Sequence, residues 1–462
     1  MNFTPQDVEN MIAQQRQFYF SRATKDVNFR KEQLLKLKTT ILKYEKEVLD
    51  ALHLDLRKSE FEAYATEVGI VLDSISYMVK HVEEWMKPEA VKTPIHLQMG
   101  KSFIVREPYG VTLIIGPFNY PFQLVMEPLI GAIVGGNTAI VKPSEISVHT
   151  AAIVRKIIEE TFDASFVRVV EGEKEEVTAL IHASFDYIFF TGSVAVGKVV
   201  ARAAAERLTP IALELGGKSP AIVDQTANLE VAAKRLSWGK FTNTGQTCVA
   251  PDYILVHKDV YEPFVKILKD TIRSFYGRNA LKSPDYGRII NVRQFDRLQK
   301  ILVEERDSIT YGGRTDRDDL YIEPTVIEHA NWTSPSMQDE LFGPILPIMM
   351  YDDLRIAIHQ IRQLPKPLAA YFFSEHEKAI NYFLEELPFG GGCINDTVTH
   401  VGNMHLPFGG VGPSGTKAYH GKASFENFTH AKSILKKSSK LETNVLFPPY
   451  KQKVKLIRTI MK

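Results

Sequence analysis

Short apolar runs that end at glycine or proline alternate with helical patterns through the middle of the chain. The first of these runs are "GVTLIIGPF", "NTAIVKPSE", "FVRVVEG" and "DYIFFTG". The stretches between them, such as "ISVHTAAIVRKIIEETF", carry apolar residues at helical spacing. Continuous apolar strands separated by helices predict a parallel sheet with helices on both faces. The pattern therefore predicts an α/β fold of the doubly wound kind.

A second series of the same kind follows, with the runs "PIALELGGKSPAIV", "YILVH", "PILPIMMY" and "LAAYFF". It predicts a second α/β domain over residues 214–405, after a first domain over residues 1–213 that opens with helices up to about Lys87. Two domains agree with the length of 462 residues, because single cores stop growing at about 250–300 residues. The glycine-rich and basic remainder, residues 406–462, is predicted to return across both domains.

Composition limits the partners and the compartment. Lys and Arg number 56 against 55 Asp and Glu, so the chain as a whole lacks the positive charge of a nucleic-acid binder. The sequence contains no run of about 18 apolar residues, so no transmembrane helix is predicted. The N-terminus "MNFTPQDVENMIAQQRQF" lacks the apolar centre of a signal peptide. A cytoplasmic protein is expected. The basic tail "KQKVKLIRTIMK" predicts a solvated helix, with contact to a membrane surface as the alternative.

The chain has two cysteines, Cys248 and Cys393, which excludes a disulfide framework. Cys248 lies in "FTNTGQTCVAP", among glycine, glutamine and threonine, whereas a structural cysteine usually packs among apolar neighbours. This setting favours a nucleophilic thiol, supported by a helix N-terminus, a cation or backbone donors. Cys393, in "FGGGCINDT", is predicted to be structural. The histidines form no H-x-x-x-H pair or Cys/His cluster, so no metal site is predicted.

Two motifs follow predicted strands in the first domain. Gly192 and Gly197 lie between a strand and a helix in "DYIFFTGSVAVGKVV", where backbone N–H groups bind phosphate. Their spacing differs from the G-x-G-x-x-G fingerprint, and a simple turn is the alternative. In "AIVKPSE", Lys142 and Glu145 lie at a strand end that faces the ligand crevice of such sheets, where they can hold ribose hydroxyls. A capped helix start is the alternative there.

Asn119 in "IIGPFNYPFQL" and Glu214 in "LELGGKSP" also follow apolar runs. An asparagine amide can donate to a developing oxyanion, and a glutamate in a partly apolar cleft can act as a general base if its pKa is raised. Turn or cap roles are the alternatives. With no metal pattern and no G-x-S-x-G motif, the residues favour cysteine chemistry with a nucleotide cofactor.

Seven motifs in this order resemble those of the NAD(P)-dependent aldehyde dehydrogenase superfamily: "PFNYP", "VKPSE", "FTGSVAVG", "LELGGKSP", "GQTCVAPDYIL", "DELFGPILPI" and "LPFGGVGPSG". The likeness covers roughly residues 60–430. "APDYIL", "FGPILPI" and "YHGKASFENFTH" are most similar to the class 3 branch, which includes fatty-aldehyde enzymes. The resemblance implies a Rossmann-like cofactor domain with an oligomerisation arm near residues 88–108, a catalytic domain over 214–405 and a bridging segment over 406–462.

The resemblance implies oxidation of an aldehyde to a carboxylic acid. Cys248 would attack the aldehyde, Asn119 and the Cys248 backbone N–H would hold the oxyanion, and Glu214 would activate the water that hydrolyses the thioester. Transfer of the acyl group to coenzyme A is an alternative that the presence of Glu214 disfavours. A non-catalytic nucleotide-binding scaffold is a third possibility.

The same resemblance implies which residues contact the cofactor. Lys142 and Glu340 would contact ribose hydroxyls, Phe342 would lie beside the nicotinamide, and residues 192–197 would receive the pyrophosphate end. A carboxylate at Glu145 should repel the 2′-phosphate of NADP, so NAD is expected and NADP is possible. The full predicted set is Lys142, Glu145, Gly192, Ser193, Gly197, Leu215, Glu340 and Phe342.

Tyr120, Trp238, Thr247 and Phe408 are candidates for the substrate tunnel, with aromatic core packing as the alternative, strongest for Trp238. The class 3 branch implies medium- or long-chain or aromatic aldehydes and a homodimer. The hydrophobic C-terminal helix of its membrane-anchored members is not found here. Pro413, Thr416 and Lys417 depart from the usual family pattern, which weakens any inference about chain length.

Overall fold

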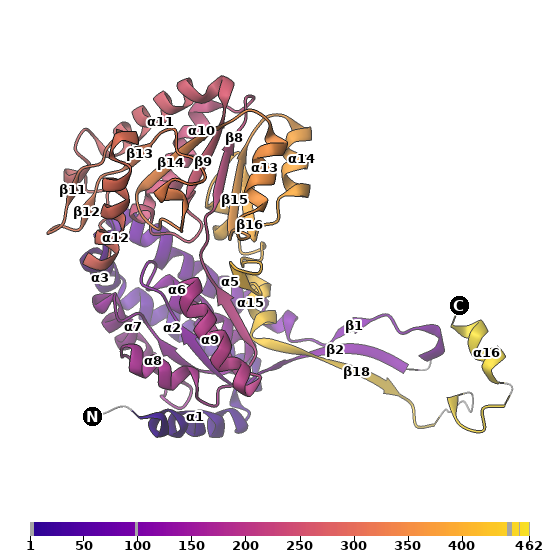
Figure 1. Ribbon diagram of the computed structural model, residues 1–462. Coiled ribbons are helices and arrows are strands. Elements are labelled where there is room, and N and C mark those ends of the chain that lie inside the picture. The colour runs from indigo at the N-terminus through magenta and orange to yellow at the C-terminus, as the bar shows by residue number, and fades with distance from the viewer. Residues whose placement is uncertain (1–3, 98–99, 441–445, 452, 462) are drawn as a thin grey trace.

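Two parallel sheets form the centres of the two lobes of the computed structural model, which describes residues 4–97, 100–440, 446–451 and 453–461 (Figure 1). The first sheet has the strand order β17-β7-β6-β3-β4-β5. Its strands are β3 (Val111–Ile115), β4 (Thr138–Lys142), β5 (Val167–Val169), β6 (Tyr187–Thr191), β7 (Ile211–Glu214) and β17 (Gly415–Thr416). All pairs are parallel except the one that β17 makes with β7. The return segment thus supplies an edge strand of the first sheet.

Helices cover both faces of this sheet. Successive residues of a strand point to opposite sides, so a continuously apolar strand needs cover on both faces. Ile114 belongs to the core shared with α6 (Gln123–Gly135) and α7 (Val148–Thr161). Leu113 belongs to the core shared with the helices of the other face. Those helices are α1 (Pro5–Phe20), α8 (Lys174–Ile181) and α9 (Val194–Arg207). The continuous apolar strands predicted from the sequence are therefore buried on both sides.

The second sheet has the order β10-β13-β14-β9-β8-β15-β16 and is parallel except at its β10 edge. Its strands are β8 (Pro220–Val223), β9 (Tyr253–His257), β10 (Ile309–Tyr311), β13 (Thr325–Ile327), β14 (Ile345–Tyr351), β15 (Ala369–Phe373) and β16 (Gly391–Ile394). Its helices are α10 (Leu229–Phe241), α11 (Tyr261–Tyr276), α12 (Val292–Glu304), α13 (Leu354–Arg362) and α14 (Glu377–Glu386). A small hairpin, β11 (Thr315–Asp316) and β12 (Tyr321–Ile322), lies outside it. The predicted fold class is confirmed.

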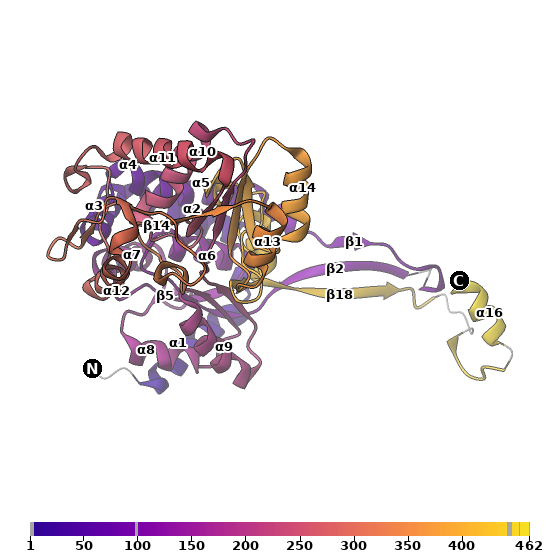
Figure 2. The ribbon, with the colours of Figure 1, turned by 45° about the horizontal axis from the view of Figure 1, so that its top comes forward.

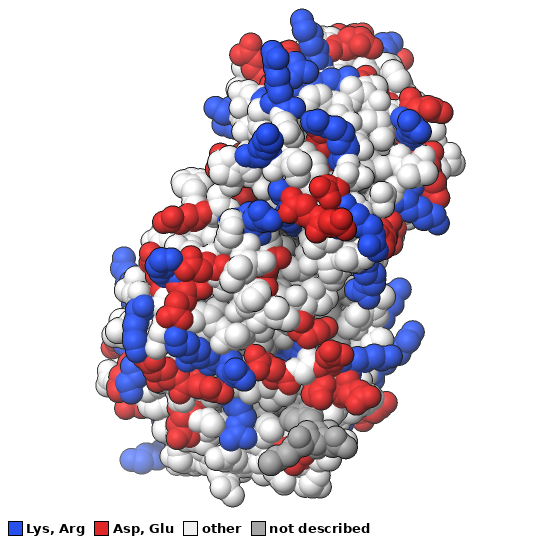
Figure 3. Space-filling view, turned by 90° about the vertical axis from the view of Figure 1, so that its left-hand side faces the viewer, with Lys and Arg blue, Asp and Glu red and all other residues white. Residues whose placement is uncertain are grey.

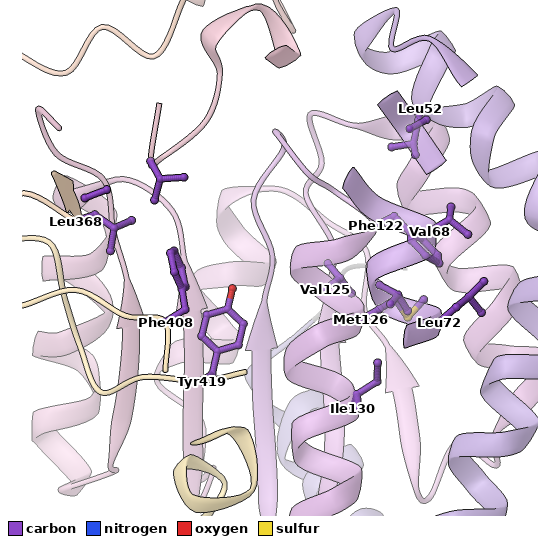
Figure 4. Packing of buried hydrophobic residues seen from close by; sticks show 14 of the residues in the cluster. Leu52, Val68, Leu72, Phe122, Val125, Met126, Ile130, Leu368, Phe408 and Tyr419 are labelled. Atoms are coloured by element: carbon purple, nitrogen blue, oxygen red, sulfur yellow. The ribbon is translucent and has the colours of Figure 1, made fainter. Parts of the chain in front are cut away.

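The helical N-terminal stretch packs against the first sheet. It comprises α1, α2 (Val27–Lys43), α3 (Glu45–Leu56), α4 (Glu60–Ala63), a π-helical turn (Tyr64–Val68) and α5 (Gly69–Trp85). The Thr4 side chain caps α1 and the Ser59 side chain caps α4, as short hydroxyl side chains commonly do. Figure 4 shows Leu52 and Leu72 from these helices in the same core as Phe122 and Met126.

A three-stranded arm projects away from both lobes (Figure 2). It consists of β1 (Glu89–Val91), β2 (Gly100–Pro108) and β18 (Thr429–Lys437), all antiparallel. β18 follows α15 (Gly421–Asn427), and α16 (Lys453–Ile460) lies beyond the tip of the arm. Residues more than 300 positions apart thus form one ribbon.

Among the described residues, every helix is too short or too polar to span a bilayer. On the face drawn in Figure 3, Lys and Arg side chains alternate with Asp and Glu side chains. This mixing agrees with the nearly balanced charge of the sequence.

Candidate active site

The predicted site residues gather where the two sheets meet. Asn119 follows β3, Lys142 ends β4, Gly192 follows β6 and Glu214 ends β7, so all four lie at the carboxyl edge of the first sheet. Five residues then lead from Glu214 to Pro220, where β8 begins. The carboxyl edge of the first sheet therefore faces the amino edge of the second, which is where the fold rules place a ligand crevice.

The turn that carries Cys248 is tightly held. Asn243, Thr244 and Gly245 all have left-handed backbone angles, with φ of 52°, 55° and 74°. A Cβ atom at Gly245 would lie 2.3 Å from the Gly343 carbonyl oxygen, so only glycine fits there. The Gln246 side chain donates to the Arg288 carbonyl at 2.9 Å and accepts from the Ile290 N–H at 3.0 Å. The turn is thereby fixed before it reaches Cys248.

Asn119 joins its own loop to this turn. Its side chain is buried, and its Nδ2 donates to the Gln246 carbonyl at 3.0 Å. Its carbonyl oxygen accepts from Asn243 Nδ2 at 2.8 Å and from Lys58 Nζ at 3.1 Å. The amide is therefore held against the turn two residues before Cys248.

Cys248 is half-buried, and burial raises the pKa of its thiol to about 12, with the carboxyl groups of Glu340 and Glu214 contributing further. Its own backbone N–H and that of Val249 act in the opposite direction. The sequence predicts a setting that favours the thiolate, and backbone donors are present as expected, but desolvation outweighs them. A thiol with a raised pKa has to lose its proton before its sulfur can act as a nucleophile.

Glu214 is almost fully buried, and neither carboxyl oxygen has a hydrogen-bond partner among the described residues. Burial raises the pKa of this carboxyl well above its usual range. A carboxyl group with free oxygens and a raised pKa fits the condition for a general base. Its backbone is held on both sides, because its carbonyl accepts from the Gly192 N–H at 3.0 Å and its strand pairs with Gly415.

The glycine motif forms a compact corner at the start of α9. Ser193 caps the helix by accepting from the Val196 N–H. A Cβ atom at Gly197 would lie 2.6 Å from Leu215 Cδ2, so the helix packs directly on that side chain. The loop thus ends at the N-terminus of a fourteen-residue helix, a position that favours negative charge.

Lys142 and Glu145 form an ion pair. Lys142 is buried at the end of β4, while the Glu145 side chain is 43% exposed. A cation and a carboxylate at one strand end can donate hydrogen bonds to ribose hydroxyls and accept hydrogen bonds from them.

Glu340 lies against the backbone that follows Glu214. A Cβ atom at Gly216 would fall 2.2 Å from Glu340 Oε2, so glycine leaves the space that this carboxyl fills. Burial and Asp252 raise the pKa of Glu340 to about 8, although a hydrogen bond from the Gly217 N–H lowers it. Phe342, at a φ of 48°, packs its ring edge-to-face on Phe118 at 5.7 Å. Donors, acceptors and a glycine-lined cradle at these positions fit a dinucleotide.

Three of the four tunnel candidates lie in the site or close to it. The Tyr120 hydroxyl and Thr247 Oγ1 are 2.6 Å apart, next to Cys248. Phe408 is buried beside Tyr419, with ring centroids 5.7 Å apart (Figure 4). Trp238 instead is 41% exposed, so it is not a core residue. It lines a surface cavity of about 390 Å³ together with Val231, Lys234, Arg235 and Phe275.

Sequence reasoning missed several residues that the fold brings to the site. Tyr419 is buried, and burial raises the pKa of its hydroxyl, with Glu214 and Cys248 contributing further. Lys58 and Glu67 form a fully buried ion pair behind Asn119. The sequence carries only a weak signal for these residues. Tyr419 is part of the family-like stretch "YHGKASFENFTH" but has no other distinguishing feature. Lys58 and Glu67 are single charged residues in a helical stretch, and such residues usually face solvent.

Comparisons with known proteins extend this picture to the whole chain. The aldehyde dehydrogenase family model matches residues 1–434. A 4,4'-diaponeurosporen-aldehyde dehydrogenase from Staphylococcus aureus is 53% identical over 455 residues, which cover 98% of this chain and 99% of the relative. Aldehyde dehydrogenase family 3 member A2 from Macaca fascicularis is 43% identical over 447 residues, covering 96% and 92%.

The fold of the chain also agrees with that of a solved relative. A solved structure of the substrate-bound state of Staphylococcus aureus AldH matches with a TM-score of 0.97 at 53% identity and covers 100% of both chains. Similarity of this extent leaves no part of either lobe unmatched. The chain belongs to the class 3 branch of the aldehyde dehydrogenase family, and it is an NAD(P)-dependent enzyme that oxidises aldehydes.

Proposed function

We propose that Cys248 is the nucleophile, that Asn119 and the Cys248 backbone N–H hold the oxyanion, and that Glu214 is the general base. The hydrogen bond from Asn119 to the Gln246 carbonyl carries this assignment, because it joins the amide to the cysteine turn. Loss of activity on replacement of Cys248 is the direct test.

The proposed reaction begins when the Cys248 thiol releases its proton to solvent and the sulfur bonds to the aldehyde carbon, while the carbonyl electron pair moves onto oxygen. The Asn119 amide and the Cys248 N–H stabilise that oxyanion. When bound, NAD(P)⁺ supplies the acceptor for the hydride that leaves the same carbon. Glu214 then takes a proton from water, whose oxygen adds to the thioester. The C–S bond breaks, the carboxylic acid leaves and the Cys248 thiolate is restored.

We expect kcat/KM for an aldehyde to rise between about pH 7 and pH 9. Cys248 acts as the thiolate in the steps that kcat/KM reports, and burial raises the pKa of its thiol to about 12. A raised pKa makes the active form scarce at neutral pH, and this form increases as the pH rises. A pH–rate profile checks the expectation. A rate that falls across this range would contradict it.

For the cofactor we propose NAD rather than NADP, held by the predicted set around Lys142, Glu340 and the 192–197 loop. The exposed carboxylate of Glu145 supports this choice, because it adds negative charge where a 2′-phosphate would lie. The ratio of kcat/KM with NAD⁺ to that with NADP⁺ is expected to exceed one and to fall several-fold in Glu145→Gln. An unchanged ratio in that variant would remove Glu145 from the specificity role.

We propose apolar aldehydes of medium or long chain, or aromatic ones, as substrates. Two aromatic side chains support this class: Tyr120, bonded to the Thr247 hydroxyl next to the cysteine, and Phe408, buried against Tyr419. The Staphylococcus aureus relative is named for 4,4'-diaponeurosporen aldehyde. A rate that increases from acetaldehyde through hexanal to decanal is the supporting result, and a preference for acetaldehyde would oppose the proposal.

We propose that the chain divides into three regions, residues 1–213, 214–405 and 406–462.

We also propose a homodimer formed through the arm. Phe103, Ile104 and Val105 on β2 remain half-exposed, and Leu435 on β18 is 43% exposed. Such apolar side chains on a projecting ribbon favour burial by a second copy.

Light scattering on the purified protein is expected to give twice the mass of one chain, and Leu435→Glu is expected to shift the population toward monomer. A monomeric wild-type protein would contradict the dimer.

We also propose a cytoplasmic location. The two free cysteines support it, because a reducing compartment keeps a nucleophilic thiol reduced.

A further inference from the structure

A fully buried ion pair lies directly behind the Asn119 loop. Lys58 and Glu67 both have completely buried side chains, and Lys58 Nζ lies 2.5 Å from Glu67 Oε1. Burying two charges costs desolvation energy that their attraction commonly fails to offset, so a buried pair is a poor device for stability alone. Its role therefore has to be sought in the groups that it contacts.

Lys58 contacts the two loop residues that border the cysteine. Its ammonium group donates to the Asn119 carbonyl at 3.1 Å and lies 4.0 Å from the centre of the Tyr120 ring. The hydrogen bond and the cation–π contact act on adjacent residues. Lys58 thus fixes the backbone from which the Asn119 amide extends.

Glu67 holds the other end of the same loop. Its second oxygen accepts from the Phe122 N–H at 2.9 Å and from the Gln123 N–H at 3.1 Å, at the start of α6. A carboxylate at a helix N-terminus is favourable and satisfies two otherwise free donors. Glu67 itself lies in the π-helical turn Tyr64–Val68, a local irregularity that is frequent at functional sites.

The same N-terminal segment also contacts the cysteine turn. Glu62 Oε1 accepts from the Asn243 N–H at 2.8 Å, and Asn243 Nδ2 donates to the Asn119 carbonyl at 2.8 Å. Asn119 O therefore has one donor from each side, Lys58 and Asn243. Residues 58–67 hold together the loop that carries Asn119 and the turn that carries Cys248.

We propose that Lys58 and Glu67 are positioning residues that set the distance between the Asn119 amide and Cys248. The inference rests on the proposed role of Asn119 as an oxyanion donor. An oxyanion site made from two separate loops works only while the loops keep their spacing, and a displacement of about 1 Å can cost about 100-fold in rate. The ion pair clamps one loop at both ends, which a single hydrogen bond cannot do.

A double-mutant cycle tests this proposal. Lys58→Met is expected to lower kcat/KM for decanal by about 10- to 100-fold, because this ratio reports the steps up to the first irreversible one. In an Asn119→Ala background the same change is expected to cost less than about 3-fold, because the positioned group is already absent. Lys58→Arg, which keeps the charge and the donors, is expected to restore most of the loss. Losses that multiply in the double variant, or no loss in Lys58→Met, would overturn the proposal.

Three measurements distinguish a positioning role from a failed oxyanion assignment, from lost cofactor binding and from a general loss of structure. If Asn119→Ala leaves kcat/KM unchanged, the proposed function is refuted. If Asn119→Ala lowers kcat/KM but Lys58→Met does not, only the positioning role is refuted. NADH binding, followed by fluorescence, is expected to be unchanged in Lys58→Met. Lys269→Met, which breaks a Lys–Glu pair with Glu328 in the second lobe, is the matched control and is expected to keep wild-type activity. If Lys58→Met does not fold, Glu67→Gln takes its place in the cycle with the same expected outcome.

Discussion

Cys248→Ser is expected to lower aldehyde-dependent NADH formation by about 10⁴-fold, because the hydroxyl that replaces the thiol is a far weaker nucleophile at neutral pH. The surrounding turn is held by Gln246 and by the backbone of Asn243 and Gly245, so the smaller side chain should leave the fold intact. NADH formation over the aldehyde series measures the effect, and binding of NADH by the variant verifies that the cofactor site is preserved.

Cys393→Ser is the matched control for this experiment. Cys393 is also half-buried, and its sulfur lies 3.5 Å from His400 Nδ1. The variant is expected to retain activity within a few-fold of wild type. Substantial turnover in Cys248→Ser, or an equal loss in Cys393→Ser, would mean that the nucleophile has been wrongly assigned.

Glu214→Gln is expected to reduce steady-state turnover by about 10²- to 10⁴-fold while leaving a first turnover, because only the water step needs this base. One NADH per active site should appear rapidly and then stop. Intact-protein mass spectrometry should show Cys248 carrying the acyl group. The amide has the shape of the carboxyl it replaces, and that carboxyl has no hydrogen bond to lose among the described residues.

Glu127→Gln is the control for a buried carboxyl outside the proposed machinery. Glu127 lies in α6, accepts from Ser74 Oγ at 2.9 Å, and burial raises its pKa to about 8. Its variant is expected to show normal steady-state turnover. Normal hydrolysis in Glu214→Gln would remove that residue from the base role. In the wild-type protein, an increase in acyl-CoA product on addition of coenzyme A would support the acylating alternative.

Local patterns were sufficient to predict the architecture. Parallel strands buried on both faces must be continuously apolar, and runs such as "TLII" and "AIVK" display this directly. The motifs around Asn119, Lys142, Glu214 and Cys248 were also predictable, because strand ends and tight turns require glycine and proline near the functional side chain.

Contacts between distant segments were not predictable in this way. β2 pairs with β18, and β17 pairs with β7, although nothing local in "GT" or "THAKSILKK" identifies a partner. Trp238 is a strongly apolar residue that the packing of α10 nevertheless leaves 41% exposed. Whether a side chain is buried depends on which surfaces pack together in the fold, and local sequence patterns do not show which surfaces these are.

The amino-acid sequence by itself determined the two-sheet α/β fold, the family and the chemical identity of the candidate nucleophile, amide and base, since these follow from local periodicity and from residue type. Only the tertiary structure decided their electrostatics and support. The raised pKa values of Cys248 and Glu214 arise mainly from their burial in the folded protein. The clamp of Lys58 and Glu67 on the Asn119 loop exists because folding brings residues about 60 positions apart into contact.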